Sequence, residues 1–115
     1  MQLTNRELFK QQAFINGVWC DADDKQTHEV FNPATNELIG TVPLMGAVET
    51  RRAIEAAATA QATWSKKTGK ERSVILRQWH TLIAENREDL ALLMTTEQGK
   101  PLAEARGEIQ SGLDY

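Results

Sequence analysis

The side chains that most often carry chemistry are few and scattered in this sequence. One cysteine, Cys20, and two histidines, His28 and His80, are the only residues of their types. A thiol nucleophile needs a neighbouring base and groups that stabilise the developing negative charge, and the predicted strand around Cys20 supplies neither. Metal sites need clusters of cysteine, histidine or carboxylate ligands, and neither histidine has such a partner at ligand spacing. We interpret Cys20 as a small packing residue and both histidines as solvated or locally hydrogen-bonded.

No glycine-rich loop for a nucleotide phosphate occurs in the chain. The pair Gly99-Lys100 is similar to the end of a phosphate-binding loop, but the upstream glycine is missing and Pro101 replaces serine or threonine. Three carboxylates between residues 85 and 89 lie near a predicted helix start, where they favour the helix dipole. The residues by themselves therefore predict no catalytic and no cofactor-binding site.

Length and composition are those of one globular domain or a piece of a larger one. Of the 115 residues, 41% are hydrophobic and 25% are charged, and the net charge is −3. No basic stripe marks a nucleic-acid surface. No apolar run approaches the ~20 residues of a membrane span, and residues 1–10 lack the apolar core of a signal peptide. We expect a cytoplasmic protein without a nucleic-acid or membrane partner.

The chain divides into two regions of different composition. Residues 1–45 contain all the phenylalanines, two of the three prolines and most turn signals, which predicts strands and turns. Residues 46–115 are rich in alanine, glutamate, leucine, lysine and arginine, which predicts helices. We therefore divide the chain into a hairpin region, 1–45, and a helical region, 46–115.

Turn residues predict two hairpins in the first region. Asn16-Gly17 between apolar runs is a strong hairpin signal, because both residues accept positive φ. A turn around Pro33, with Asn on either side, predicts a second hairpin. Ahead of both, Thr4 followed by Glu7 predicts a short helix that Thr4 caps. The strands predicted for the second hairpin are residues 27–31 and 37–43.

Four helices are predicted in the second region. Gly46 opens the first, and Asn86 is expected to cap the third with Asp89 as its reciprocal partner. Gly99 suits the end of the third helix, and Pro101 suits the first turn of the fourth. A break between the first two helices is predicted at residues 68–70. The small apolar stripe of the first helix, which should let a neighbouring element approach closely, consists of Ala53, Ala57, Ala60 and Trp64.

The elements together predict an α+β chain with N-terminal β-hairpins packed on about four helices. The fourth predicted helix has no stop signal before Tyr115. A helix that continues to the last residue suggests truncation, so we expect the 115 residues to be a piece of a longer protein.

Five segments, in their order and spacing, resemble the aldehyde dehydrogenase family. Their common features are Asn-Gly followed by Trp, an Asn-Pro turn, an alanine-rich helix closed by Trp, the next helix, and a Glu-x-Gly-Lys-Pro stretch. The flanks of the last segment, and residues 8–17, most resemble the succinate-semialdehyde branch of the family, whereas Cys20 and residues 112–114 depart from it. The five segments are residues 14–19, 31–40, 53–64, 71–77 and 93–101.

The resemblance implies an oxidoreductase that converts succinate semialdehyde, or a related aldehyde, to the carboxylic acid with NADP or NAD. In such enzymes a cysteine attacks the aldehyde carbon, hydride passes to the nicotinamide, and a glutamate activates water. The resemblance places these groups and the cofactor loops after residue 115, and Cys20 does not align with the nucleophile. It therefore assigns this segment no catalytic and no cofactor-binding residue, and we expect the 115-residue chain alone to be inactive.

The resemblance also implies supporting roles for this segment. It would belong to the α/β cofactor domain of the parent enzyme, with the remainder of that chain as its partner and a homo-oligomer as the assembly. Many relatives bind a monovalent cation through backbone carbonyls, and the matching positions here are Val30 and Glu97. The alternative function is a non-catalytic helical interaction module, which the missing active site and the apolar helix stripes suggest.

Overall fold

The first hairpin turns at Asn16 and Gly17, as predicted. In the computed structural model, which describes all of residues 1–115, φ is 52° at Asn16 and 78° at Gly17. These left-handed values are those that a two-residue hairpin turn requires. The turn joins β1 (Ala13–Ile15) to β2 (Val18–Cys20) as an antiparallel pair.

The second hairpin is also confirmed. It pairs β3 (Thr27–Phe31) with β4 (Leu38–Pro43) in antiparallel register. Asn36 in the connecting turn has a φ of 59°, which asparagine tolerates better than most residues. The register shifts between Val30 and Phe31, because Ile39 of β4 is an extra residue opposite them.

The helical half contains four α-helices, and the predicted α+β class is confirmed. A short 3-10 helix, η1, precedes the first hairpin. The last strand ends and the first long helix begins close to residue 45. The division of the chain into a hairpin region and a helical region as domains stays a prediction. The helices are η1 (Arg6–Leu8), α1 (Ala47–Trp64), α2 (Gly69–Glu85), α3 (Arg87–Gln98) and α4 (Leu102–Asp114).

One predicted helix cap is wrong, and a second is right in its position but not in its hydrogen bonds. Asn5, not Thr4, caps η1, because its side-chain oxygen accepts the N–H of Glu7 at 3.1 Å. Asn86 precedes α3, but its side chain makes no capping bond, and Asp89 is not its reciprocal partner. The Asp89 carboxylate is bonded instead to backbone N–H groups near the N-terminus of the chain.

The connection between α1 and α2 contains a helix cap that was not predicted. The predicted break at residues 68–70 lies too far along the chain, because α2 already begins at Gly69. The Glu71 carboxylate accepts the N–H of Thr68 at 2.7 Å, and the Thr68 hydroxyl oxygen accepts the N–H of Glu71 at 3.3 Å. This reciprocal pair is a capping box, whose Thr-x-x-Glu spacing was visible in the sequence.

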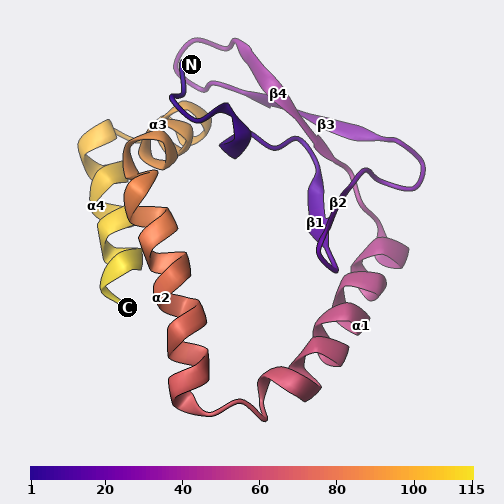
Figure 1. Cartoon of the computed structure of the whole chain (residues 1–115). Coiled ribbons are helices and arrows are strands. Elements are labelled where there is room, and N and C mark those ends of the chain that lie inside the picture. Colours follow the sequence, from indigo (N-terminus) through magenta and orange to yellow (C-terminus); the bar gives the residue numbers. More distant parts are fainter.

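The elements form an open ring (Figure 1). Helices α2, α3 and α4 lie together on one side and α1 lies on the other. The two hairpins join the sides at one end, and the connection between α1 and α2 joins them at the other. The radius of gyration is 16.6 Å, whereas a compact chain of about 100 residues has roughly 13 Å. The close neighbour predicted for the alanine stripe of α1 is not supplied by this chain, because Ala57 and Ala60 are exposed. The core is correspondingly small, and its buried residues are Leu3, Ala22, Glu49, Asp89, Ala91 and Ala105.

Gly99 ends α3 in the left-handed conformation, as predicted. Its φ is 73°, and its N–H donates to the carbonyl oxygen of Thr95 at 2.9 Å. Pro101 stands one residue before α4, which begins at Leu102. A Cβ at position 99 would lie 2.8 Å from Cγ of Pro33, in the turn of the second hairpin. The helix end and the hairpin turn therefore approach each other closely.

We expect Gly99→Ala to destabilise the chain. The left-handed conformation alone costs about 1–2 kcal/mol for a residue with a Cβ, and contact with Pro33 adds to that cost. The matched control is Gly107→Ala inside α4, where an added Cβ meets nothing within 4 Å and is expected to stabilise by roughly 0.5–1 kcal/mol. Urea unfolding followed by circular dichroism measures both. Equal midpoints for Gly99→Ala and the unmodified chain would contradict this prediction.

Candidate functional site

Asp89 joins the N-terminal segment to α3. Its carboxylate accepts the backbone N–H of Asn5 at 2.7 Å and that of Thr4 at 3.1 Å. A third bond runs from Asn5 Nδ2 to Asn86 Oδ1 at 3.1 Å. Asp89 is only 8% exposed, so these bonds replace the water that the carboxylate loses. The backbone N–H groups of Asn5 and Thr4 hold the pKa of Asp89 below its ordinary value of 3.8.

A small cavity lies where the N-terminal segment, the second hairpin and the end of α3 meet. Its volume is about 20 Å³, which is room for one water molecule or one ion. Val30 and Glu97, the two positions carried over from the family resemblance, both line this cavity. The complete lining is Phe9, Lys10, Gln11, Val30, Ile39, Gly40, Thr41, Val42 and Glu97.

Both of these positions lie near the end of a regular element. Val30 pairs with Gly40 directly before the register shift, where Ile39 of β4 is the extra residue opposite Val30 and Phe31. Glu97 is in the last turn of α3, whose carbonyl groups have no N–H partner within the helix and carry the negative end of the helix dipole. Backbone oxygen at such places is available to a cation more readily than in the middle of a helix or strand.

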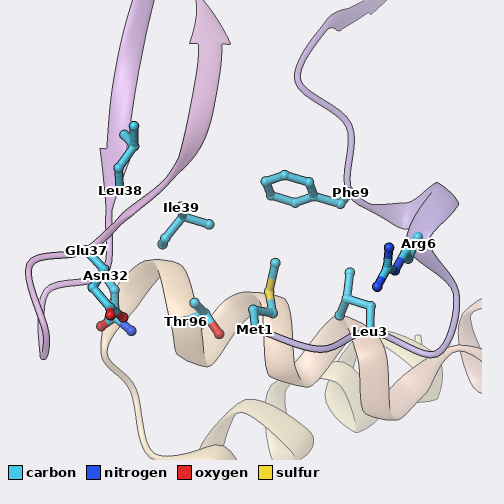
Figure 2. Close-up of a pocket in the computed structure, with 9 residues that line it drawn as sticks. All are labelled: Met1, Leu3, Arg6, Phe9, Asn32, Glu37, Leu38, Ile39 and Thr96. Atoms are coloured by element: carbon cyan, nitrogen blue, oxygen red, sulfur yellow. The ribbon is translucent and has the colours of Figure 1, made fainter.

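A larger pocket of about 290 Å³ adjoins the same junction (Figure 2). The Phe9 ring points from the N-terminal segment toward Ile39 of β4, and Met1 and Leu3 lie below it. Phe9 and Ile39 line both this pocket and the small cavity. The pocket contains no cysteine and no histidine, and its one carboxylate belongs to Glu37. Its lining is Met1, Leu3, Arg6, Phe9, Asn32, Glu37, Leu38, Ile39 and Thr96.

The structure does not bring the cysteine and the two histidines together. Cys20 is half-buried in β2, and its thiol donates to the carbonyl oxygen of Ala13 across the hairpin at 3.6 Å. His28 on β3 and His80 on α2 are both exposed. No group of three or more histidine, cysteine or carboxylate side chains is placed to hold a metal ion.

Residues 19–115 match the model of the aldehyde dehydrogenase family. The chain belongs to this family. It is 65% identical over 109 residues to a glutarate-semialdehyde dehydrogenase of Pseudomonas putida, an alignment that covers 95% of this chain and 23% of that protein. It is 55% identical over 115 residues to the NADP(+) succinate-semialdehyde dehydrogenase of Escherichia coli, covering 100% of this chain and 24% of that protein.

Solved aldehyde dehydrogenase structures contain the same arrangement of elements. A succinate-semialdehyde dehydrogenase from Burkholderia pseudomallei superposes with a TM-score of 0.94 at 56% identity, over 98% of this chain and 23% of that one. An NADP-dependent enzyme of E. coli superposes with a TM-score of 0.94 at 53% identity, over 97% of this chain and 23% of that one. The predicted family and fold are thereby confirmed. The chain spans about a quarter of the length of the relatives that it matches.

Aldehyde dehydrogenases use NAD or NADP, but the N-terminus of α1 does not fit a cofactor phosphate. The only connection from a strand to an α-helix leads from β4 to α1, and helix N-termini are the usual place for such an anion. Here the Glu49 carboxylate occupies that end, accepting the N–H of Asp23 at 3.0 Å and that of Gly46 at 3.1 Å. The hydrogen bond from the Asp23 backbone is the main reason that the pKa of Glu49 is lowered. A charged carboxylate at this helix end would repel a phosphate.

The Gly46-x-x-Glu49 spacing is the sequence signal that marks this occupied helix end. None of the four α-helices combines the length and the apolarity that a membrane crossing requires.

We expect the stability contributed by Asp89 to disappear in acid. A carboxyl whose folded pKa lies below its unfolded value stabilises the fold above the unfolded pKa, and this contribution is lost as pH falls through the folded pKa. Asp89→Asn does not titrate, so its stability deficit relative to the unmodified chain should shrink as pH falls below 3.8. Urea unfolding at a series of pH values measures this difference. A deficit that stays constant over the whole series would contradict the assignment.

Proposed function

We propose that this chain is the N-terminal segment of a semialdehyde dehydrogenase, which oxidises succinate semialdehyde or its longer homologue glutarate semialdehyde to the dicarboxylate with NADP or NAD. The observation that carries the proposal is the identity to named enzymes over nearly the whole chain. A glutarate-semialdehyde dehydrogenase is 65% identical to this chain, and two succinate-semialdehyde dehydrogenases are 54% and 55% identical. Both substrates have an aldehyde at one end and a carboxylate at the other, so a pocket that binds a carboxylate suits both.

The segment itself is proposed to be structural. It contains no cluster of nucleophile, base and oxyanion donors, and its one strand-to-helix connection is occupied by Glu49. The nucleophile, the water-activating carboxylate and the cofactor loops are therefore assigned to the remainder of the parent enzyme. The cofactor would accept hydride from the aldehyde carbon there, and no residue of this segment takes part in that transfer.

Exposed apolar side chains indicate that another protein surface packs against this segment. Trp79 and Leu82 on α2 are 61% and 58% exposed, and Phe14 on the first hairpin is 61% exposed. Apolar surface on this scale normally marks a contact with another part of a protein. We propose that the remainder of the dehydrogenase chain makes most of these contacts within a cytoplasmic homo-oligomer. The identity to full-length enzymes favours this function over a free-standing interaction module.

We also propose that the small cavity binds a monovalent cation through the backbone carbonyls of Val30 and Glu97. The cavity has room for a single ion, and its two backbone positions lie at a bulge and at a helix C-terminus. The Glu97 carbonyl has no N–H partner within α3, and the Val30 carbonyl lies beside the register shift of the second hairpin. Hard monovalent cations prefer oxygen ligands.

The substrate proposal is tested with the full-length dehydrogenase. We expect kcat/KM for succinate and glutarate semialdehyde to exceed that for butanal and pentanal, which lack the carboxylate, by roughly 10- to 100-fold. This factor is what a charge-assisted hydrogen bond to a carboxylate contributes. Equal kcat/KM for pentanal and glutarate semialdehyde would contradict the substrate class. The 115-residue chain serves as the second arm, and turnover by that chain at an enzyme-like rate would refute its structural role.

The cation proposal is tested by crystallography with rubidium. Crystals of the full-length enzyme soaked in rubidium chloride should show anomalous scattering between the carbonyl oxygens of Val30 and Glu97. Soaking in choline chloride at the same ionic strength is the control, because choline is far too large for a cavity of about 20 Å³. Absence of a rubidium peak at this position at high soak concentration would rule the site out.

A further inference from the structure

The apolar face of α2 contains one cationic residue, Arg72. It is followed by Leu76, Trp79 and Ile83, at intervals of four, three and four residues. Such intervals place side chains one above another along a helix. All four residues line one hollow between α2 and the last turn of α4. The Arg72 guanidinium therefore lies in line with the apolar side chains of α2.

The hollow beside α2 is large, and its apolar lining is exposed. Its volume is about 770 Å³. Leu76 and Trp79 are 48% and 61% exposed. Helix α4 lies along α2 and does not fill this space (Figure 1). Exposed apolar surface of this kind normally marks a contact with another part of a protein.

The half-buried side chain of Arg72 has no acceptor in this chain. The ion pairs of the structure belong to five other lysine and arginine residues. The only acidic side chain in the lining of the hollow is Asp114, which accepts a hydrogen bond from Gln110 Nε2 at 2.8 Å. Glu71, the residue before Arg72, is engaged with Thr68 in the capping box. The guanidinium thus has no charged partner.

The start of α2 also has an excess of positive charge. Residues 66–77 contain five lysines or arginines and one acid, whereas the whole chain has 13 basic and 16 acidic residues. None of these five cations forms an ion pair. Charges across an interface are arranged to complement one another, so this surface suits an acidic partner better than a basic one.

Covering the apolar face of α2 would remove the Arg72 guanidinium from water. A charged group is tolerated away from water only when it is paired and hydrogen-bonded. A carboxylate matches a planar guanidinium best, because its two oxygens accept two parallel N–H groups. The covering surface must therefore bring an acceptor to Arg72, and the surrounding positive charge favours a carboxylate over a backbone carbonyl.

We propose that Arg72 anchors α2 to the remainder of the dehydrogenase chain, through an ion pair with a carboxylate of that remainder. This anchor rests on the proposed function, which supplies the occupant of the hollow. The alignments cover 23% and 24% of two related enzymes, so most of such an enzyme lies outside this segment. Apolar side chains of the same occupant fill the space beside Trp79, and its carboxylate binds the guanidinium.

The test measures the melting temperature of the full-length dehydrogenase. Arg72→Met keeps a long side chain but leaves the partner carboxylate buried without a cation, so the melting temperature should fall by roughly 5 °C or more. The matched control is Lys70→Met in the first turn of the same helix. Lys70 is exposed and does not line the hollow, so its loss should change the melting temperature by less than about 1 °C. Equal melting temperatures for the two variants would overturn the anchor.

Two further variants distinguish an ion pair from a neutral hydrogen bond. Arg72→Lys keeps the positive charge, whereas Arg72→Gln keeps N–H donors without charge. A carboxylate partner requires Arg72→Lys to melt closer to the unmodified enzyme than Arg72→Gln does. The reverse order, or equal melting temperatures, would rule the carboxylate out. This comparison decides the question if Arg72→Met does not fold.

Two more measurements address other partners of Arg72. Asp114→Asn should leave the melting temperature unchanged, and a loss as large as that of Arg72→Met would place the partner within this segment and refute the proposal. Mass photometry of Arg72→Met should give the same oligomer as the unmodified enzyme. Smaller particles would make the partner a second subunit and would equally refute it. The ratio of kcat/KM between glutarate semialdehyde and pentanal tests the substrate class independently, so either proposal can fail alone.

Discussion

The buried carboxylate of Asp89 holds the first residues of this chain against α3. It binds the N–H groups of Thr4 and Asn5, so the first residues of the chain are bonded to a helix that begins more than eighty residues later. A nearly buried carboxylate is tolerated only when hydrogen bonds replace its hydration, and two charge-assisted bonds do so here. Closing so long a loop costs chain entropy, but this cost rises only slowly with loop length. Two good bonds and the burial of Leu3 offset it.

The location of both cavities follows from this one contact. The N-terminal segment lies against the second hairpin because Asp89 holds its beginning and Gln11 holds its end. Its side chain Phe9 then lines the larger pocket as well as the small cavity. Without the contact to Asp89, the hairpin and the end of α3 would still meet at Gly99 and Pro33, but the cavity would have no third wall.

Local features of the fold were predictable, whereas the contact that joins its parts was not. The turn at Asn16-Gly17 and the helix end at Gly99 are predicted correctly, since their backbone conformations are set by the residues themselves. The same reasoning fails at Asp89, because an acid near a helix start has a local explanation as a capping partner. Its real donors, Thr4 and Asn5, are 85 and 84 positions away, and no spacing rule connects them. The Thr68-Glu71 cap, by contrast, was local and could have been found.

The candidate cation site could not have been derived from residue types, for a physical reason. Its proposed ligands are backbone carbonyls, and every residue carries one. A valine and an exposed glutamate therefore give no chemical signal, and only the family resemblance drew attention to Val30 and Glu97. What distinguishes them is position, since one adjoins a bulge and the other lies in a final helical turn. Replacing either side chain leaves the oxygen in place. A change that moves the bulge, or the Gly99 stop that follows Glu97, displaces the oxygen without touching either residue.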